Sequence, residues 1–236
     1  MSKKTKILIM CGGRGKRLGD ITQDIPKPLI KINNKTILEN KIKQYQSQGF
    51  NDFVLCIGYK GSMIKELIEK NTNINASFSD AGLEAGILNR LYRAKDVFGK
   101  NVLMTYGDTY TDIDIEDLIR FHNNSSNEAT IVVSPIQNPF GLVEFNEENQ
   151  VTYFREKPVL NYYIGYAVIN NSALDIVPKA VINLPDGEGL VQFYKTLQEK
   201  NLLGCYFHGG LEATFNTKEE LASAKSKMSR FYTAEV

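Results

Sequence analysis

The chain has 236 residues, of which 42% are hydrophobic and 23% charged, a composition typical of a globular protein with room for one α/β domain and a sizeable core. Its net charge is +1 and it contains no basic block, which excludes the electrostatic signature of a nucleic-acid or membrane-surface protein. No apolar run approaches the length of a membrane span and no signal-peptide core follows the first residues, so we expect a cytoplasmic protein with neither nucleic-acid nor membrane partners.

Strand-like and helix-like segments alternate over the first half of the chain. The expected strands are 6–11, 53–57, 75–79, 102–106 and 130–134, and the expected helices are 37–48, 62–70, 85–97 and 114–123. This alternation with short links predicts an α/β fold with a Rossmann-like, doubly wound, mixed and mostly parallel sheet. Ligands of such sheets bind beyond the carboxyl ends of the strands.

After Pro139 the pattern changes to short strands at 142–145, 151–155 and 163–169, which is typical of an antiparallel or mixed insertion. A helix at 188–201, a strand at 204–207 and a last helix at 218–227 follow. We therefore predict one domain over 1–236, with a main lobe (1–138), a small second lobe (139–203), a return to the main sheet (204–228) and a tail (229–236).

The first strand ends in a loop that combines glycines with cations. Its residues are Gly12, Gly13, Gly15, Lys16 and Arg17. Glycines let backbone N–H groups approach a phosphate closely, and an arginine can bind two phosphate oxygens at once. Lys27, between two prolines, adds a positive charge on a stiffened segment. The loop predicts a site for a nucleoside triphosphate.

Two other phosphate loops do not match. A P-loop needs Ser or Thr after Gly15-Lys16, where Arg17 stands. A dinucleotide fingerprint needs a glycine in place of Leu18, and an acidic residue after the next strand, where 58–60 reads Gly-Tyr-Lys. A P-loop enzyme and an NAD-dependent oxidoreductase are therefore disfavoured.

Further candidate residues follow later strands. Asp108, after Gly107 and the strand 102–106, is placed to hold Mg²⁺ beside the glycine loop, although a lone Gly-Asp is more often a turn or a helix cap. Glu156-Lys157-Pro158 ends a strand of the second lobe and is either a phosphate-binding pair or a surface ion pair. Glu188, in Asp-Gly-Glu at 186–188, either opens a helix or contacts a second substrate.

Four motifs, taken in order, resemble those of the bacterial sugar-1-phosphate nucleotidyltransferase family. They are Gly-Gly-x-Gly-x-Arg-Leu at 12–18, Pro-Lys-Pro at 26–28, Gly-Asp at 107–108 and Glu-Lys-Pro at 156–158. The resemblance covers about residues 6–227, and its nearest branch is that of the glucose-1-phosphate cytidylyltransferases. It implies a nucleotidyltransferase domain that uses Mg²⁺, or Mn²⁺, to transfer the cytidylyl group of CTP to a phosphorylated small molecule, with release of pyrophosphate.

The resemblance also implies individual roles. Arg17 would stabilise the departing pyrophosphate, and Lys27 the charge that develops around the α-phosphate. Asp108 would hold the metal. The nucleotide would contact Gly12, Gly13, Gly15, Lys16, Gly82, Gly86 and Gly107, and the acceptor would contact Glu156, Lys157, Tyr163, Gly165 and Glu188.

Two departures from the family pattern concern the metal and the acceptor. Asn216 stands where the family has a second metal-binding aspartate, and offers a weaker, neutral ligand. Tyr163-Ile164-Gly165 replaces an Asn-Gly-Gly that would contact sugar hydroxyls. We therefore favour a phosphoglutamine-like acceptor, used in capsule or surface polysaccharide synthesis, over a sugar 1-phosphate. A non-catalytic nucleotide-binding module and a homo-oligomer both remain open.

Overall fold

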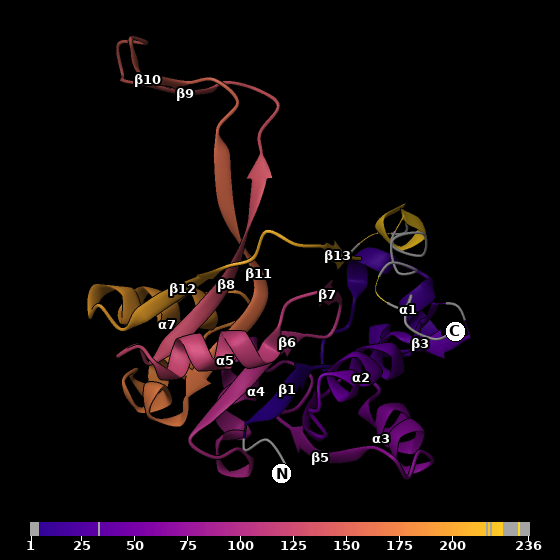
Figure 1. Cartoon of the computed structure of the whole chain (residues 1–236). Helices are drawn as coiled ribbons and strands as arrows, with labels where there is room; N and C mark the ends of the chain where they lie inside the picture. The colour runs from indigo at the N-terminus through magenta and orange to yellow at the C-terminus, as the bar shows by residue number, and fades with distance from the viewer. Residues whose placement is uncertain (1–4, 33, 216, 218, 224–230, 232–236) are drawn as a thin grey trace.

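The computed structural model describes residues 5–32, 34–215, 217, 219–223 and 231. Within these residues, seven strands form one central sheet in the order β12-β8-β11-β6-β1-β4-β5, with helices against both of its faces (Figure 1). The strands are β1 (Lys6–Met10), β4 (Asp52–Ile57), β5 (Asn75–Asp80), β6 (Asn101–Tyr106), β8 (Ala129–Gln137), β11 (Val159–Asn170) and β12 (Leu203–Phe207).

Three short strand pairs lie outside this sheet. They are β2 (Lys31–Ile32) with β3 (Lys35–Thr36), β7 (Thr109–Thr111) with β13 (Glu212–Thr214), and β9 (Leu142–Phe145) with β10 (Val151–Arg155). The α-helices are α1 (Ile21–Asp24), α2 (Ile37–Ser47), α3 (Gly61–Glu69), α4 (Ile87–Arg93), α5 (Ile115–Asn123), α6 (Lys179–Ile182) and α7 (Glu188–Glu199). The 3-10 helices are Lys16–Leu18, Lys27–Leu29, Lys95–Val97 and Asn171–Asp175.

The sheet is mixed and mostly parallel, as the alternating pattern predicts. β1 runs parallel to both β4 and β6, so the residues that follow these strands meet at one edge. β11 is antiparallel to β6 and to β8. The expectation that 163–169 belongs to an insertion is wrong, because β11 lies inside the main sheet. Of the three strands expected in that insertion, β9 and β10 stand apart from the main sheet.

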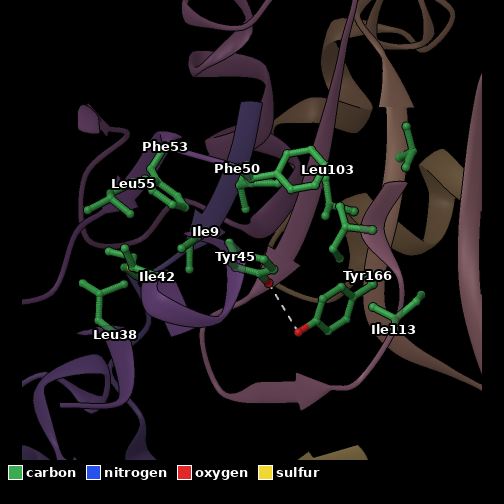
Figure 2. Packing of buried hydrophobic residues seen from close by; sticks show 14 of the residues in the cluster. Ile9, Leu38, Ile42, Tyr45, Phe50, Phe53, Leu55, Leu103, Ile113 and Tyr166 are labelled. Atoms are coloured by element: carbon green, nitrogen blue, oxygen red, sulfur yellow. Dashed lines mark hydrogen bonds between the residues drawn. The ribbon is translucent and has the colours of Figure 1, made fainter. Parts of the chain in front are cut away.

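Alternation along the strands divides the core between the two faces of the sheet. Ile7 and Ile9 of β1 pack with α2, α3 and α5, while Leu8 packs on the other face with α4, α6 and α7. Figure 2 shows the first cluster, in which Tyr45 of α2 and Tyr166 of β11 turn their hydroxyl groups toward each other. Both faces are covered, which explains why the strands read as nearly continuous apolar runs.

Local signals place several helix boundaries. Thr36 and Glu39 form a capping box at the start of α2, and Asp114 caps α5 by accepting from the backbone of Asp117 at 2.9 Å, as predicted. The helix expected over 85–97 is shorter, since α4 begins after Gly86 and gives way to the 3-10 turn at 95–97. Every helix among the described residues falls short of the length and apolarity that a bilayer span requires.

The last predicted segments are described only in part. Within the helix expected at 218–227, residues 219–223 are helical and the others lie outside the described residues. Phe231 is the described residue of the tail expected at 229–236, and its ring lies 6.3 Å from that of Tyr110. Phe231 therefore packs against a third, smaller apolar cluster near β2 and β3. This cluster consists of Leu18, Ile30, Ile32, Ile37, Tyr110, Phe215 and Leu221.

His122, near the end of α5, is a buried histidine within the polar part of the core. Its side chain is 2% exposed, with Nδ1 2.9 Å from the Thr130 hydroxyl and Nε2 3.0 Å from the Asn170 amide oxygen. Burial lowers the pKa of His122 below its ordinary value of 6.5. Folded His122 therefore stays neutral at a pH where the unfolded residue binds a proton.

We expect the free energy of unfolding to fall as the pH drops below about 6.5. In that range His122 binds a proton in the unfolded state but stays neutral in the folded state. Urea unfolding of the wild type and of His122→Gln at pH 7.5 and 5.5 checks this. The loss of stability on acidification should be smaller in the variant, which has no titrating group at this position. The same acid dependence in both proteins would contradict it.

Candidate active site

A cleft of about 750 Å³ opens at the carboxyl ends of β1 and β6. The loop after β1 and the turn after β6 form its floor, together with Lys27 and Pro28. The turn before α4, the turn before α7 and the middle of β11 supply other parts of the wall. The cleft thus lies at the edge where open α/β sheets bind their ligands.

The glycine loop has the close backbone packing that its sequence predicts. The carbonyl of Gly12 accepts from the amide of Tyr59 at 3.0 Å, which ties the loop to the end of β4. Gly15 has φ +63°, in the left-handed region that favours glycine, and its carbonyl accepts from the backbone of Leu18 at 2.9 Å. These bonds hold the loop open toward the cleft.

Arg90 of α4 lies beneath this loop, and sequence reasoning missed it. It donates to the carbonyl of Ile57 at 2.7 Å and to that of Leu83 at 3.3 Å, and its side chain is 5% exposed. A Cβ on Gly12 would lie 2.2 Å from its Nη1. Gly12 therefore leaves the space that the Arg90 guanidinium group occupies.

Lys27 and Asp108 form an ion pair on the floor of the cleft. Lys27 Nζ lies 2.5 Å from Asp108 Oδ2, and the two side chains are 12% and 23% exposed. They come from segments 81 residues apart, the proline-flanked turn and the end of β6. In this partly enclosed position the pair is much less screened by solvent than a surface salt bridge.

Gly107 brings the Asp108 turn against β1. Its amide donates to the carbonyl of Met10 at 3.2 Å, and a Cβ at this position would lie 2.6 Å from that oxygen. Only a glycine allows the two strand ends to approach this closely without a shift of backbone.

A buried ammonium group supports the same turn from below. Lys41 of α2 is fully buried, and its Nζ donates to the carbonyl of Thr109 and, at 2.9 Å, to the hydroxyl of Tyr166. The rings of Tyr45, Tyr110 and Tyr166 surround it at 4.8–5.6 Å. A lysine on the apolar face of the helix expected at 37–48 was the signal in the sequence that could have identified it.

Burial alone would raise the pKa of Tyr166, but the charge and the hydrogen bond of Lys41 outweigh it, so the pKa of Tyr166 lies below its ordinary value of 10. The tyrosine hydroxyl in turn donates to the Thr109 carbonyl at 2.9 Å. Lys41 and Tyr166 thus position the residue that follows Asp108.

Tyrosines form the wall of the cleft that β11 supplies. The ring of Tyr163 stands edge-on to those of Tyr106 and Tyr194, with centroids 5.9 and 5.5 Å away. Burial raises the pKa of Tyr163 well above its ordinary value, so this hydroxyl stays neutral. Gly165 has φ +80°, and a Cβ on it would lie 2.5 Å from the ring of Tyr106. It therefore makes room for the tyrosine wall.

The structure brings together most of the residues predicted for the site. Those that line the cleft are Gly12, Gly13, Gly15, Lys16, Arg17, Lys27, Gly107, Asp108, Tyr163 and Gly165. Gly82 and Gly86 do not line it themselves, but the residues between them, Leu83 to Ala85, do. Arg14 and Glu84 connect this turn to the glycine loop by an ion pair of 2.9 Å.

Three predicted acceptor residues do not reach the cleft. Glu156 and Lys157 are exposed just after the carboxyl end of β10, and Glu188 is exposed at the first turn of α7. Instead of Glu188, its neighbour Asp186 lines the cleft and accepts from the amide of Ile87 at 3.3 Å. The roles of these three residues toward an acceptor stay predictions.

The donors present suit a magnesium ion that is shared with a bound triphosphate. Asp108 is a hard oxygen ligand, and Mg²⁺ in proteins is often held by one or two carboxylates together with substrate phosphates. The described residues contain no group of three acidic, histidine or cysteine side chains that would form a metal cage by themselves. Asn216, the other predicted ligand, lies outside the described residues.

Comparison with known proteins agrees with this geometry. A family model described as nucleotidyl transferase matches residues 6–178. A Bacillus subtilis (strain 168) protein named "Probable glucose-1-phosphate cytidylyltransferase" is 30% identical over 92% of this chain and 93% of its own. The glucose-1-phosphate cytidylyltransferase of Salmonella typhi is 31% identical over 73% of this chain and 77% of its own.

The fold has relatives among solved structures as well. HddC from Yersinia pseudotuberculosis, crystallised in complex with GMP-PN, superposes with a TM-score of 0.72 at 19% identity, over 95% of this chain and 99% of that one. At this identity the likeness concerns the fold alone.

The contact between Gly107 and Met10 can be tested by a stability measurement. Gly107→Ala should lower the free energy of unfolding by about 1–3 kcal/mol, because the new methyl group meets a backbone oxygen that cannot move freely. Gly99→Ala is the control, since a Cβ there has no neighbour within 4 Å, and it should change stability by less than about 0.5 kcal/mol. Equal urea midpoints for both variants would contradict the close approach.

Proposed function

The chain belongs to the nucleotidyl transferase family, as its motifs predict, and from that premise we propose that it transfers the cytidylyl group of CTP to a phosphorylated small molecule. The preferred acceptor in this proposal is a phosphoglutamine-like compound. The product would supply an activated phosphate for capsule or surface polysaccharide synthesis in the cytoplasm.

The observation that carries the proposal is the Lys27–Asp108 pair beneath the glycine loop. In the proposed reaction an oxygen of the acceptor phosphate bonds to the α-phosphorus of CTP. The bond from this phosphorus to the oxygen that bridges to the β-phosphate breaks, and pyrophosphate leaves with the electron pair. Such a transfer needs positioning and charge neutralisation rather than a protein nucleophile.

Each cation of the site has a place in this scheme. The backbone of the glycine loop and Lys16 would bind the β- and γ-phosphates, and Arg17 would neutralise the charge that gathers on the pyrophosphate. Lys27, on the floor, would lie closest to the α-phosphate. Asp108 keeps Lys27 in this position, since their ion pair fixes its ammonium group before any substrate binds.

Asp108 would also hold Mg²⁺, which when bound supplies positive charge to the oxygens of the triphosphate. The turn from Gly107 to Thr109 places its carboxylate rigidly, since Met10 and Lys41 hold the two sides of that turn. A carboxylate fixed in this way loses little entropy when it binds a metal.

The lining of the cleft supports an amino-acid type of acceptor. Beside Tyr162 and Tyr163 it contains the carboxylates of Asp186 and Glu212, and one oxygen of Glu212 is buried without a hydrogen-bond partner in the described structure. Carboxylates complement an ammonium group, whereas a hexose needs several hydrogen-bond partners for its hydroxyls, and the aromatic wall offers few. A phosphorylated amino acid combines a phosphate with such an ammonium group.

A sugar 1-phosphate is the second candidate. It is favoured by the glucose-1-phosphate in the names of the similar proteins from Bacillus subtilis and Salmonella typhi. The Asp186 and Glu212 carboxylates would then accept from sugar hydroxyls instead of from an ammonium group.

Pyrophosphate release identifies both substrates. We expect turnover with CTP in preference to ATP, GTP, UTP and TTP, in the presence of Mg²⁺ or Mn²⁺, and with phosphoglutamine in preference to glucose 1-phosphate, other sugar 1-phosphates and phosphocholine. If glucose 1-phosphate were the one acceptor that supports turnover with CTP, the proposed acceptor would be wrong and the proposed cytidylyl transfer would stand. CTP binding without pyrophosphate release from any acceptor would favour a non-catalytic module, and an absence of CTP binding would refute the proposal.

Replacing the proposed metal ligand tests the reaction centre. Asp108→Asn should lower kcat by about a hundredfold or more, because an amide cannot neutralise Lys27 or bind Mg²⁺ as a carboxylate does. Asp96→Asn, in the 3-10 turn 95–97 outside the cleft, is the matched control and should keep full activity. Asp96→Asn should unfold at the wild-type temperature, and Asp108→Asn should remain folded at the assay temperature, which circular dichroism checks. An Asp108→Asn enzyme as fast as the control would remove Asp108 from the reaction.

A further inference from the structure

Helix α2 holds the segment that follows Asp108 through a row of hydrogen bonds along one of its faces. Three side chains of this row donate to backbone carbonyls of the segment. They are Lys41, which donates to Thr109, Gln44, which donates to Thr111, and Gln48, which donates to Ile113 at 3.2 Å. The fourth bond runs the other way, from the hydroxyl of Tyr110 to the carbonyl of Ile37. The chain is therefore tied to α2 from the first residue after Asp108.

The start of α2 also holds the turn that carries Lys27. The amide of Ile37 donates to the carbonyl of Ile30 at 2.9 Å, and the amide of Ile30 donates to the carbonyl of Lys27 at 3.1 Å. Lys41 lies one helical turn further along α2 and bonds the residue next to Asp108. A single turn of one helix thus supports both members of the ion pair on the floor of the cleft.

Lys41 differs from the other members of this row because it carries a charge. Its partners in the described structure are neutral: the Thr109 carbonyl, the Tyr166 hydroxyl and three tyrosine rings, of which Tyr45 and Tyr166 are drawn in Figure 2. Neutral partners compensate a buried ammonium group for its lost hydration less fully than a carboxylate does. Gln44 holds a carbonyl of the same strand without a charge. A lysine is therefore a costly choice if its task is only to hold the backbone.

The charge of Lys41 acts close to the floor of the cleft. Burial raises the pKa of Cys11, which lines the floor, and the positive charge of Lys41 acts against that rise. A hydrogen bond from a charged donor is about twice as strong as one between neutral groups. Lys41 therefore holds the Thr109 carbonyl, and with it the turn of Asp108, more firmly than an uncharged donor would.

From these contacts we propose that Lys41 is a positioning residue for the reaction, which fixes Asp108 opposite Lys27 while its buried charge makes the fold less stable than an apolar side chain would. Lys41 does not line the cleft, so it acts through the turn at Thr109 and not by contact with a substrate. The effect on turnover rests on the proposed cytidylyl transfer. The effects on Asp108 and on stability do not depend on it.

Lys41→Met tests the proposal, because methionine is unbranched, adapts to irregular spaces and carries no charge. The Tyr166 hydroxyl would still donate to the Thr109 carbonyl. The midpoint of urea unfolding should be unchanged or higher, while kcat for pyrophosphate release should fall about tenfold and the KM for CTP should change by less than about twofold. Gln44→Met is the matched control, since it removes a bond to the same strand two residues further from Asp108, and it should keep the wild-type kcat.

A double-mutant cycle measures the link between Lys41 and Asp108 without an assay of activity. Asp108→Asn should lower the urea midpoint of the wild type, because it removes the charge that pairs with Lys27. The same change should lower the midpoint less in the Lys41→Met protein, where Asp108 is no longer held opposite Lys27. In the Gln44→Met protein the loss should equal that in the wild type.

Three results would overturn the proposal. The first is a Lys41→Met enzyme as fast as the Gln44→Met control. The second is a urea midpoint of Lys41→Met below that of the wild type, which would give Lys41 a structural role. The third is an equal loss from Asp108→Asn in the wild-type and Lys41→Met proteins. If the wild type releases no pyrophosphate from CTP with any acceptor, the proposed function fails instead, and the urea midpoints by themselves decide whether Lys41 positions Asp108.

Discussion

The active-site floor depends on one buried charge. Lys41 has no contact with solvent, so the free energy of its desolvation must be offset inside the protein. The Thr109 carbonyl, the Tyr166 hydroxyl and three tyrosine rings supply that compensation. Because these groups come from α2, β7 and β11, the ammonium group fixes the turn that carries Asp108 to both the helix layer and the sheet. The position of Asp108 thus depends in part on Lys41 and Tyr166, which do not line the cleft.

β11 links the cleft to residues 136–162, which comprise the outer ends of β8 and β11 together with β9 and β10 and are called the arm here. Its inner end pairs with β6 in the core, its middle carries Tyr163 and Gly165 in the cleft wall, and its outer end continues into the arm. Tyr162 and Ile136 belong to both the cleft lining and the arm. The strand register shifts between Tyr163 and Ala167, where the left-handed Gly165 makes room for Tyr106. The cleft wall and the arm therefore share one continuous strand.

The parts of the site that follow parallel strands could be predicted. The glycine loop and Asp108 end β1 and β6, and neighbouring parallel strands bring their carboxyl ends to the same edge. Glu156 and Lys157 could not be placed in this way, because a hairpin can point toward a cleft or away from it with the same residue pattern. Arg90 was also missed, since an arginine on a short helix gives no sign that Gly12 and Gly58 leave space for its guanidinium group.

The amino-acid sequence was enough to predict the fold class, the family and the residues that line the floor of the cleft, because these depend on local periodicity and on glycine and cation motifs that act within a few residues. Only the tertiary structure decided that β11 completes the main sheet, that Lys41 is buried beneath Asp108 and that the arm stands clear of the body. Each of these is a contact between segments far apart in the chain, or the lack of one. Such contacts depend on how complete surfaces fit together, and no local pattern of residues encodes that fit.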